Sequence, residues 1–176
     1  MAPVYNASMT PGTLIERLAA TPGILANLLA ESTDDQLDAT TPGEWPARVV
    51  AAHLRDNEIL VMRLRLERML SEDGPVFPNF DEKAWAATRS LARDRKEQIL
   101  ADFALQRHAS LNILRSLRPR DWRRAGRHEQ YGAFTVTTWL ARWAEHDAAH
   151  LAQLERCLGE TFEAVRDRRA RRDPLA

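Results

Sequence analysis

Four long segments of this chain place apolar residues at three- and four-residue steps, the period of a helix that buries one face. The first follows Thr10-Pro11 and has an apolar face over 14–29, and the others cover about 46–71, 90–117 and 136–157. No segment of useful length alternates apolar and polar residues, as a half-buried strand would. The pattern therefore predicts an all-α fold, a four-helix bundle with long connecting loops.

Prolines, glycines and threonines set the expected ends of these helices. Thr21-Pro22 predicts a kink or break inside the first helix, because proline cannot donate the backbone hydrogen bond of a helix interior. Gly74-Pro75 is expected to end the second helix and Gly159 the fourth, which Thr135 or Thr137 would cap. The long irregular stretch between the second and third helices is typical of a functional loop.

Length and composition indicate one domain over residues 1–176, with a core from about 11 to 160 and an arginine-rich tail over 161–176. Because the formal net charge is zero, the chain as a whole does not indicate a nucleic-acid partner. The arginines of the tail are more simply a solvated helix end, so nucleic-acid binding is not expected.

The sequence also bears on the compartment. The single cysteine, Cys157, excludes an internal disulfide and fits a reducing environment. No stretch approaches the roughly 20 apolar residues of a membrane span, and the first residues lack the basic start and apolar run of a secretory signal. These observations favour a cytoplasmic protein without a membrane partner.

One stripe on the fourth predicted helix combines aromatic, apolar and ligand-type side chains. Its members recur at three- and four-residue steps and are Trp139, Trp143, His146, His150, Gln153, Leu154 and Cys157. Polar groups in a core-facing stripe are costly unless something satisfies them. A metal ion does so, because neutral imidazole is a common metal ligand. His53 lies on the apolar side of the second helix and would complete a three-nitrogen site that leaves a metal open to water.

Helical spacing also assigns roles to the neighbours of these histidines. Asn57 and Gln153 each lie one turn from a predicted ligand on the same face, so they are candidates for hydrogen bonding to the ligands. Trp139 and Trp143 are candidates for core packing or for pocket walls. Cys157 lies two turns beyond the last histidine, too far along the helix for direct ligation.

The spacing of the histidine pair is by itself a weak motif, because such pairs also arise by chance. Histidines that pack in the core or lie on the surface are the alternative interpretation. His108 and His128 are expected to be solvated, on an outer helix position and in a loop. Asp56, Glu58 and Asp147 are more typical of a solvated face than of a metal environment.

Several segments occur in an order and spacing that is more specific than any single motif. They are Gly43–Pro46, Val50–Glu58, Phe77-Pro78, Phe80–Glu82 and Ala144–Gln153. Through them the chain resembles the DinB-like superfamily of four-helix-bundle proteins. The resemblance implies a divalent metal, often nickel, zinc or iron, and His53, His146 and His150 fill all three ligand positions of the family pattern. It also implies homodimers and, in some relatives, reactions that use low-molecular-weight thiols.

Two hypotheses about function follow. The first is a metal-dependent enzyme, a thiol-dependent transferase or a hydrolase, in which a metal at the three histidines activates a thiol or water toward a small-molecule substrate. The second is a non-enzymatic metal- or ligand-binding module of a stress response. It is motivated by the sequence itself, in which no convincing general base, nucleophile or cofactor-recognition motif stands beside the histidines.

Overall fold

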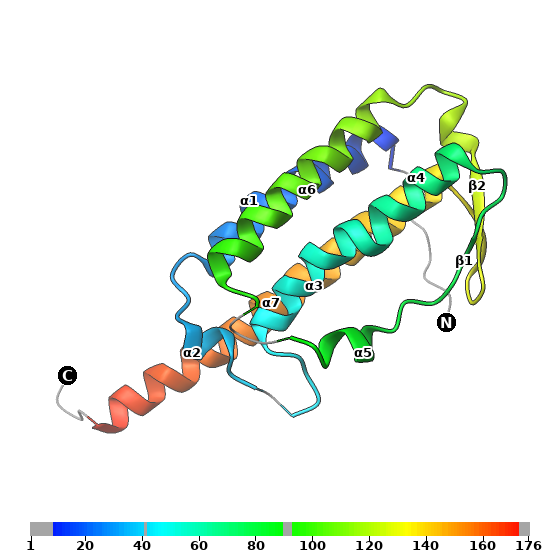
Figure 1. Cartoon of the computed structure of the whole chain (residues 1–176). Coiled ribbons are helices and arrows are strands. Elements are labelled where there is room, and N and C mark those ends of the chain that lie inside the picture. The colour runs from blue at the N-terminus through cyan, green and yellow to red at the C-terminus, as the bar shows by residue number, and fades with distance from the viewer. Residues whose placement is uncertain (1–8, 41, 90–92, 173–176) are drawn as a thin grey trace.

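The structure is a bundle of four long helices, which confirms the predicted fold (Figure 1). The computed structural model describes residues 9–40, 42–89 and 93–172, and the side chains among them up to residue 159. The long helices are α1 (Pro11–Leu29), α3 (Ala47–Asn57) with its continuation α4 (Leu64–Ser71), α6 (Lys96–Ser116) and α7 (Val136–Arg172). Because α1 and α3 each pack against both α6 and α7, the four helices enclose a long core.

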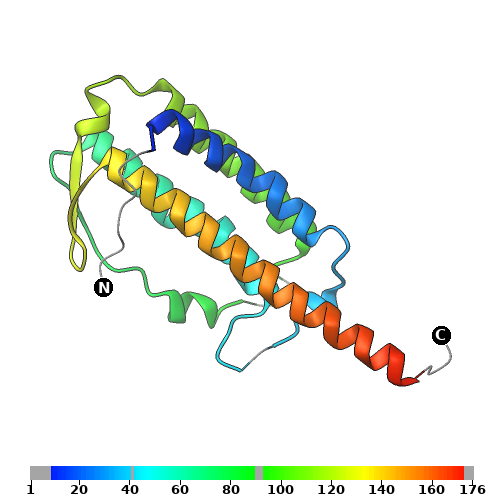
Figure 2. The same ribbon diagram turned by 180° about the vertical axis from the view of Figure 1, so that it is seen from behind.

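The connections between these helices give the bundle a crossover topology. A short helix, α2 (Asp34–Leu37), lies in the connection from α1 to α3. The segment from α4 to α6 carries strand β1 (Val76–Phe77) and helix α5 (Glu82–Ala86), and it runs back along the outside of the bundle (Figure 1). As a result α3 and α6 run in the same direction, and so do α1 and α7 (Figures 1 and 2).

A small sheet lies at the end of the bundle where α4 ends (Figure 1). After the short helix η2 (Asp121–Arg123), strands β2 (Ala125–His128) and β3 (Gly132–Thr135) form a hairpin, and β1 pairs in parallel with β2. A Cβ atom on Gly126 would lie 2.5 Å from Cε2 of Phe77, so only glycine allows the two strands this approach. Strands of two and four residues are too short for an alternating pattern to be visible in the sequence.

Helix α1 continues through Pro22, so a break there is wrong, while the kink stays a prediction. Proline cannot donate to the carbonyl of residue i−4, which is Leu18. Instead, Nη1 of Arg107 donates to the Leu18 carbonyl oxygen at 2.8 Å. A side chain from α6 thus replaces the missing backbone donor, and the helix need not break.

The second helix begins and ends close to its predicted bounds but contains a feature that its period did not reveal. Between α3 and α4 it widens into a π-helical segment, η1 (Glu58–Arg63). Such segments are rare and frequently occur at functional sites. Here the segment begins directly after Asn57, and both Asn57 and Glu58 are buried.

The last two long helices differ from their predicted ranges. α6 begins at Lys96 rather than near Ser90, which lies outside the described residues. Thr135 caps α7, since its Oγ1 accepts from the backbone N–H of Thr138, and Thr137 plays no such part. α7 does not end at Gly159, which lacks the positive φ of a glycine C-cap. The arginine-rich tail therefore continues this helix to residue 172, and 173–176 lie outside the described part of the chain.

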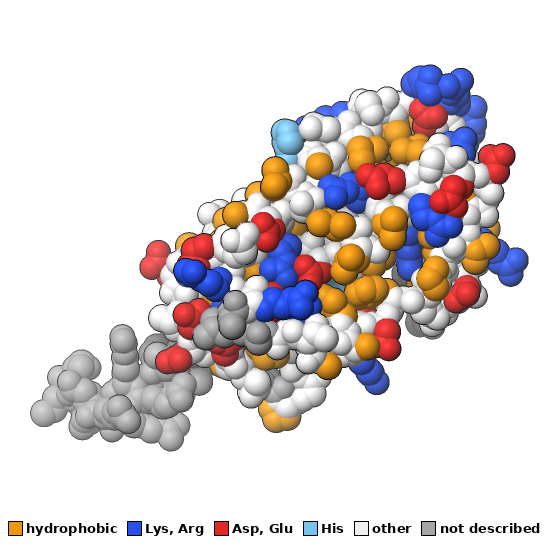
Figure 3. Space-filling model, in the orientation of Figure 1, with side chains coloured by type: hydrophobic (Ala, Val, Ile, Leu, Met, Phe, Trp, Pro, Cys, Tyr) orange, Lys and Arg blue, Asp and Glu red, His pale blue; other side chains and the backbone are white. Residues whose placement is uncertain are grey.

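The surface carries no large area of one charge on the face shown in Figure 3, where acidic and basic side chains are interspersed over α6 and α3–α4. This distribution agrees with the formal net charge of zero. Among the described residues, no helix has both the length and the apolar character that crossing a membrane requires.

Charged groups meet inside the bundle rather than on its surface. Arg107 of α6 is 1% exposed, and its guanidinium donates to both carboxylate oxygens of Glu58, at 3.1 and 2.8 Å, and to Oδ2 of Asp147 at 2.7 Å. Trp143 Nε1 also donates to Glu58, and the hydroxyl of Thr21 donates to Asp147. The expectation that Glu58 and Asp147 lie on a solvated face is wrong, because a buried cation neutralises them.

The substitution Arg107→Met should lower the free energy of unfolding by about 3–5 kcal/mol, because two carboxylates would remain buried without a counter-charge. Urea denaturation measures the change. The matched control is Arg115→Met, at an exposed position of the same helix, where the change should be within about 0.5 kcal/mol. A loss under about 1 kcal/mol for Arg107→Met would contradict this role.

Candidate metal centre

Three histidines from two helices meet near the middle of the bundle. His53 projects from α3, and His146 and His150 project from successive turns of α7. Each offers a ring nitrogen, and these nitrogens all lie within 4.8 Å of one another. The Nε2 atoms of His53 and His146 are 3.2 Å apart. The structure thus brings together residues that are 93 positions apart in the chain.

This arrangement can be tested against the geometry that a metal requires. Two nitrogens that bind one zinc ion at about 2.0–2.1 Å and a tetrahedral angle lie about 3.3 Å apart. The separation of 3.2 Å between the Nε2 atoms of His53 and His146 is close to that value. The ring of His150 also packs against both, with centroid distances of 4.6 and 4.5 Å. The donor set and its spacing therefore fit a divalent ion with nitrogen ligands.

The protonation of the site also suits a cation. Burial, with the nearby rings of His146 and His150, lowers the pKa of His53 to about 2. Burial and His146 likewise lower the pKa of His150 to about 4, although a hydrogen bond to Gln153 opposes the shift. Both imidazoles are therefore neutral at pH 7, and each has a lone pair available for a metal.

The two residues predicted to lie beside the clustered histidines both contact them. Oε1 of Gln153 is 2.9 Å from Nδ1 of His150, a contact that places the proton of this ring on Nδ1 and leaves Nε2 with its lone pair. Nδ2 of Asn57 lies 2.7 Å from Nε2 of His53 and 3.2 Å from Nε2 of His146. Asn57 thus reaches the ring nitrogens that face the centre of the cluster.

Aromatic side chains from two connections enclose His53. The rings of Trp45 and Trp85 each lie 5.2 Å from its ring, centroid to centroid. Trp85 is on α5, and its indole N–H donates to Oδ2 of Asp56 at 2.9 Å. Asp56 also forms ion pairs with Arg55 and Arg89 at 2.7 Å. The sequence suggested that Asp56 is solvated, and this expectation is wrong. Asp56 instead holds the crossover segment against the histidines.

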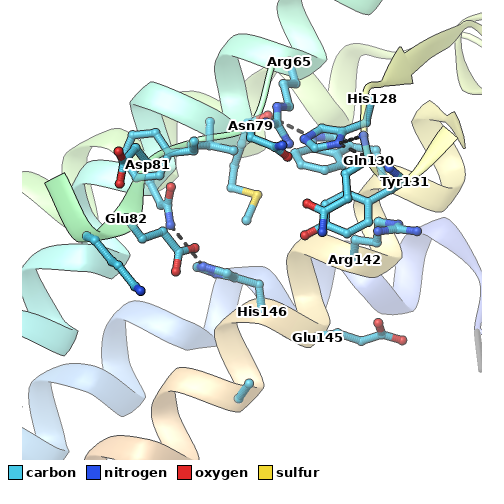
Figure 4. A pocket seen from close by; sticks show the side chains of 17 residues that line it. Arg65, Asn79, Asp81, Glu82, His128, Gln130, Tyr131, Arg142, Glu145 and His146 are labelled. Carbon is cyan, nitrogen blue, oxygen red and sulfur yellow. Dashed lines mark hydrogen bonds between the residues drawn. The ribbon is translucent and has the colours of Figure 1, made fainter. Parts of the chain in front are cut away.

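On its other side the cluster borders an open pocket of about 680 Å³ (Figure 4). Asn57 and His146 form the edge of the pocket, and Trp139 is part of its wall. Trp143 does not line this pocket, because it is fully buried and its indole N–H is bonded to Glu58. His128 also lines the pocket and is only 2% exposed, so the prediction that it is solvated is wrong.

The remaining candidates lie apart from the cluster. His108 is exposed on α6, as expected. Cys157 is half-buried, with its sulfur 3.7 Å from Oε2 of Glu44 and 3.8 Å from the carbonyl oxygen of Trp45. These contacts place Cys157 beside the entry to α3 and not among the ring nitrogens.

Comparison with known proteins agrees with this fold. Residues 17–154 match the sequence profile of the DinB superfamily. The chain belongs to the DinB superfamily. The match extends from α1 to α7 and includes all three clustered histidines.

Relatives of this chain carry names that refer to a metal. A protein of Oceanobacillus iheyensis, named "Putative metal-dependent hydrolase", is 28% identical over 141 residues, which cover 80% of this chain and 81% of that protein. The Bacillus subtilis protein YfiT is also named "Putative metal-dependent hydrolase" and is 28% identical over 152 residues, which cover 82% of this chain and 84% of YfiT.

Two solved structures of four-helix bundle proteins are also similar. YfiT of Bacillus subtilis, described as a probable metal-dependent hydrolase with an unusual four-helix bundle topology, superposes with a TM-score of 0.73 at 26% identity. The match covers 90% of this chain and 94% of YfiT. The protein TT2238 superposes with a TM-score of 0.58 at 25% identity, over 83% of this chain and 98% of that protein.

The contacts of Asp56 predict how the stability of this DinB protein changes at low pH. Burial alone would raise the pKa of Asp56, but hydrogen bonds from Arg55 and Trp85 and the charge of Arg89 outweigh it, and the pKa lies below its usual value. The stability that the carboxylate contributes is then present above the usual pKa of about 3.9 and is lost as the pH falls through the lower, folded-state value. At pH 6, Asp56→Asn should therefore lower the free energy of unfolding by about 1–3 kcal/mol.

This difference between wild type and Asp56→Asn should narrow at pH 3, as denaturant titrations at both pH values can measure. Asp73→Asn is the control, because Asp73 is fully exposed and lies 3.7 Å from its nearest cationic partner. It should change stability by less than about 0.5 kcal/mol at either pH. An Asp56→Asn difference that is equal at pH 3 and pH 6 would refute the ion-pair explanation.

Proposed function

We propose that this protein is a metal-dependent hydrolase of a small molecule, with the metal held by His53, His146 and His150. One observation carries the proposal: three imidazoles from two helices face one another within 4.8 Å at the edge of an open pocket. The names of the relatives, which describe metal-dependent hydrolases, support the same reaction class. Nickel, zinc and iron all accept such a set of nitrogen donors.

The residues around such a metal site have different roles. A divalent ion on three neutral nitrogens lowers the pKa of a bound water or thiol toward neutrality. Gln153 orients the ring of His150, and Asn57 offers an amide beside the open side of the cluster. The indoles of Trp45 and Trp85 pack against the ring of His53 and shield it. The pocket beside His146 offers a substrate an approach to the cluster.

A transferase that uses a low-molecular-weight thiol is the second form of this proposal. A thiol would take the same open position as water, and the same histidines would serve both reactions. The family resemblance also implies a homodimer, which stays a prediction. A non-enzymatic binding module would hold the metal without turnover, so the measurements below separate it from an enzyme.

The metal site predicts the composition of the purified protein. Elemental analysis should find close to one divalent metal ion per chain, and His150→Ala should reduce it to background, because two nitrogen ligands hold an ion weakly. The matched control is His108→Ala, which removes an exposed histidine outside the cluster and should leave the metal content unchanged. Full metal retention by His150→Ala would rule out the proposed ligand set.

The reaction class predicts turnover that depends on the metal. Wild-type protein should hydrolyse members of a panel of small esters and amides, and a chelator should abolish the activity until metal is restored. A parallel panel of thiols with an electrophile tests the transferase form. Turnover in either panel that is lost in His150→Ala supports an enzyme. A fully metal-loaded protein that is inactive in both panels would favour the binding module.

A further inference from the structure

A buried arginine lies at the end of the pocket away from α5 and is not explained by the metal site. Arg65 of α4 lines the pocket and is only 8% exposed. It forms no ion pair with a carboxylate of the described residues, and its one hydrogen bond runs from Nη2 to the carbonyl oxygen of Pro78, at 2.9 Å. Burial lowers its pKa, and the opposing influence comes from the phenol of Tyr131 and not from a carboxylate. A buried cation without a counter-ion is costly.

The contacts of Arg65 hold its guanidinium in place but leave most of its donors unused. The group lies over the rings of Phe77 and Trp139, at 5.6 and 5.2 Å from their centroids. These cation–π contacts compensate part of the cost and fix the plane of the group. A guanidinium has five N–H donors, and the hydrogen bond to Pro78 uses one. The others remain for a ligand.

A second donor beside Arg65 has its tautomer fixed by the backbone. Nδ1 of His128 accepts from the backbone N–H groups of Gln130 and Tyr131, at 3.1 and 3.4 Å. A neutral imidazole that accepts at Nδ1 carries its proton on Nε2. His128 is kept neutral, since burial and the charge of Arg65 lower its pKa. Its second ring nitrogen is therefore an N–H donor, on a side chain that lines the pocket.

Arginine and histidine side chains gather at one end of the pocket. Figure 4 shows Arg65, His128, Tyr131 and Arg142 gathered at one end, and Asp81 and Glu82 at the other, with His146 between them. Asp81 caps α5, and Lys83 of α5 also lines the pocket. Arg142 packs over the ring of Tyr131 at 5.1 Å. The carboxylate of Glu145 also lines the pocket, but it is exposed and its charge acts on Arg142. The hydrogen-bond donors at this end of the pocket are thus concentrated around the guanidinium of Arg65.

We propose that this end of the pocket is a subsite for the carboxylate group of a small organic anion, bound by Arg65 and the Nε2–H of His128. The planar fork of a guanidinium matches a carboxylate and forms two parallel hydrogen bonds with it. Arg65 and His146 line the same pocket, so a molecule with its carboxylate at Arg65 can place its reacting group beside His146. This placement of the reacting group rests on the proposed metal site, whereas the anion subsite does not.

The subsite can be tested without a metal. In the His150→Ala background, NMR titration should show that hexanoate binds at least about tenfold more tightly than hexanamide, the effect expected of one hydrogen bond to a charged group. Arg65→Met should abolish this preference while it retains a side chain that packs on Phe77 and Trp139. Circular dichroism and thermal unfolding would establish that the variant is folded.

Arg68→Met is the matched control for this experiment. Arg68 lies on the same helix and over the same Phe77 ring, at 5.1 Å, but it is paired with Glu72 and does not line the pocket. It should leave the preference for hexanoate unchanged. Equal affinities for hexanoate and hexanamide, or a preference that survives Arg65→Met in a folded protein, would overturn the proposal. Because this background lacks a metal ligand, neither result depends on the proposed hydrolase.

In metal-loaded protein, two matched pairs identify which molecule carries the carboxylate. The first pair is the mono-4-nitrophenyl ester of adipate against 4-nitrophenyl acetate, and the second is 6-mercaptohexanoate against 6-mercaptohexanol. A loss of about tenfold or more in Arg65→Met for the anionic ester alone assigns the carboxylate to the hydrolysed substrate. The same loss for the anionic thiol alone assigns it to a thiol co-substrate. No loss for either anion would count against the subsite.

Discussion

One buried guanidinium connects all four long helices of this protein. Arg107 belongs to α6, and it bonds to Glu58 at the start of η1, to Asp147 on α7 and to the carbonyl oxygen of Leu18 on α1. Each of these partners would be costly to bury alone, since two are carboxylates and the third is a carbonyl that Pro22 leaves without a backbone donor. Satisfied together, they fix the register of the helices. Asn57 and His146 directly precede two of these residues, so the same network positions the histidine cluster.

Around this rigid centre, the long connections build the rest of the site. The crossover segment supplies Trp85 beside His53, and Asp56 holds it there through the indole N–H. The hairpin of β2 and β3 supplies His128 at the far end of the pocket. Ligand-type side chains therefore come from the bundle core, whereas much of the pocket wall comes from loops. Variation in such loops can change the substrate while the helices keep the chemistry.

Two predictions from the sequence were wrong for the same physical reason. Considered locally, a proline inside α1 should break the helix. Acidic residues beside a histidine motif should likewise be solvated. Arg107 reverses both, because one side chain from α6 provides the missing donor for Leu18 and the counter-charge for Glu58 and Asp147. A sign of this role was present in the sequence: Arg107 falls between Phe103 and Leu111 on the apolar face of its helix.

The sequence by itself determined the helical class, the four long helices and the faces that carry His53, His146 and His150, because periodicity and spacing are properties of a single helix. It also predicted which side chains lie one turn from those histidines, and both contact them. Only the tertiary structure decided that α3 packs against α7 at the height where the three rings meet. It alone joined Arg65, His128 and His146 in one pocket, since distances between elements depend on packing and crossover topology, which no local pattern encodes.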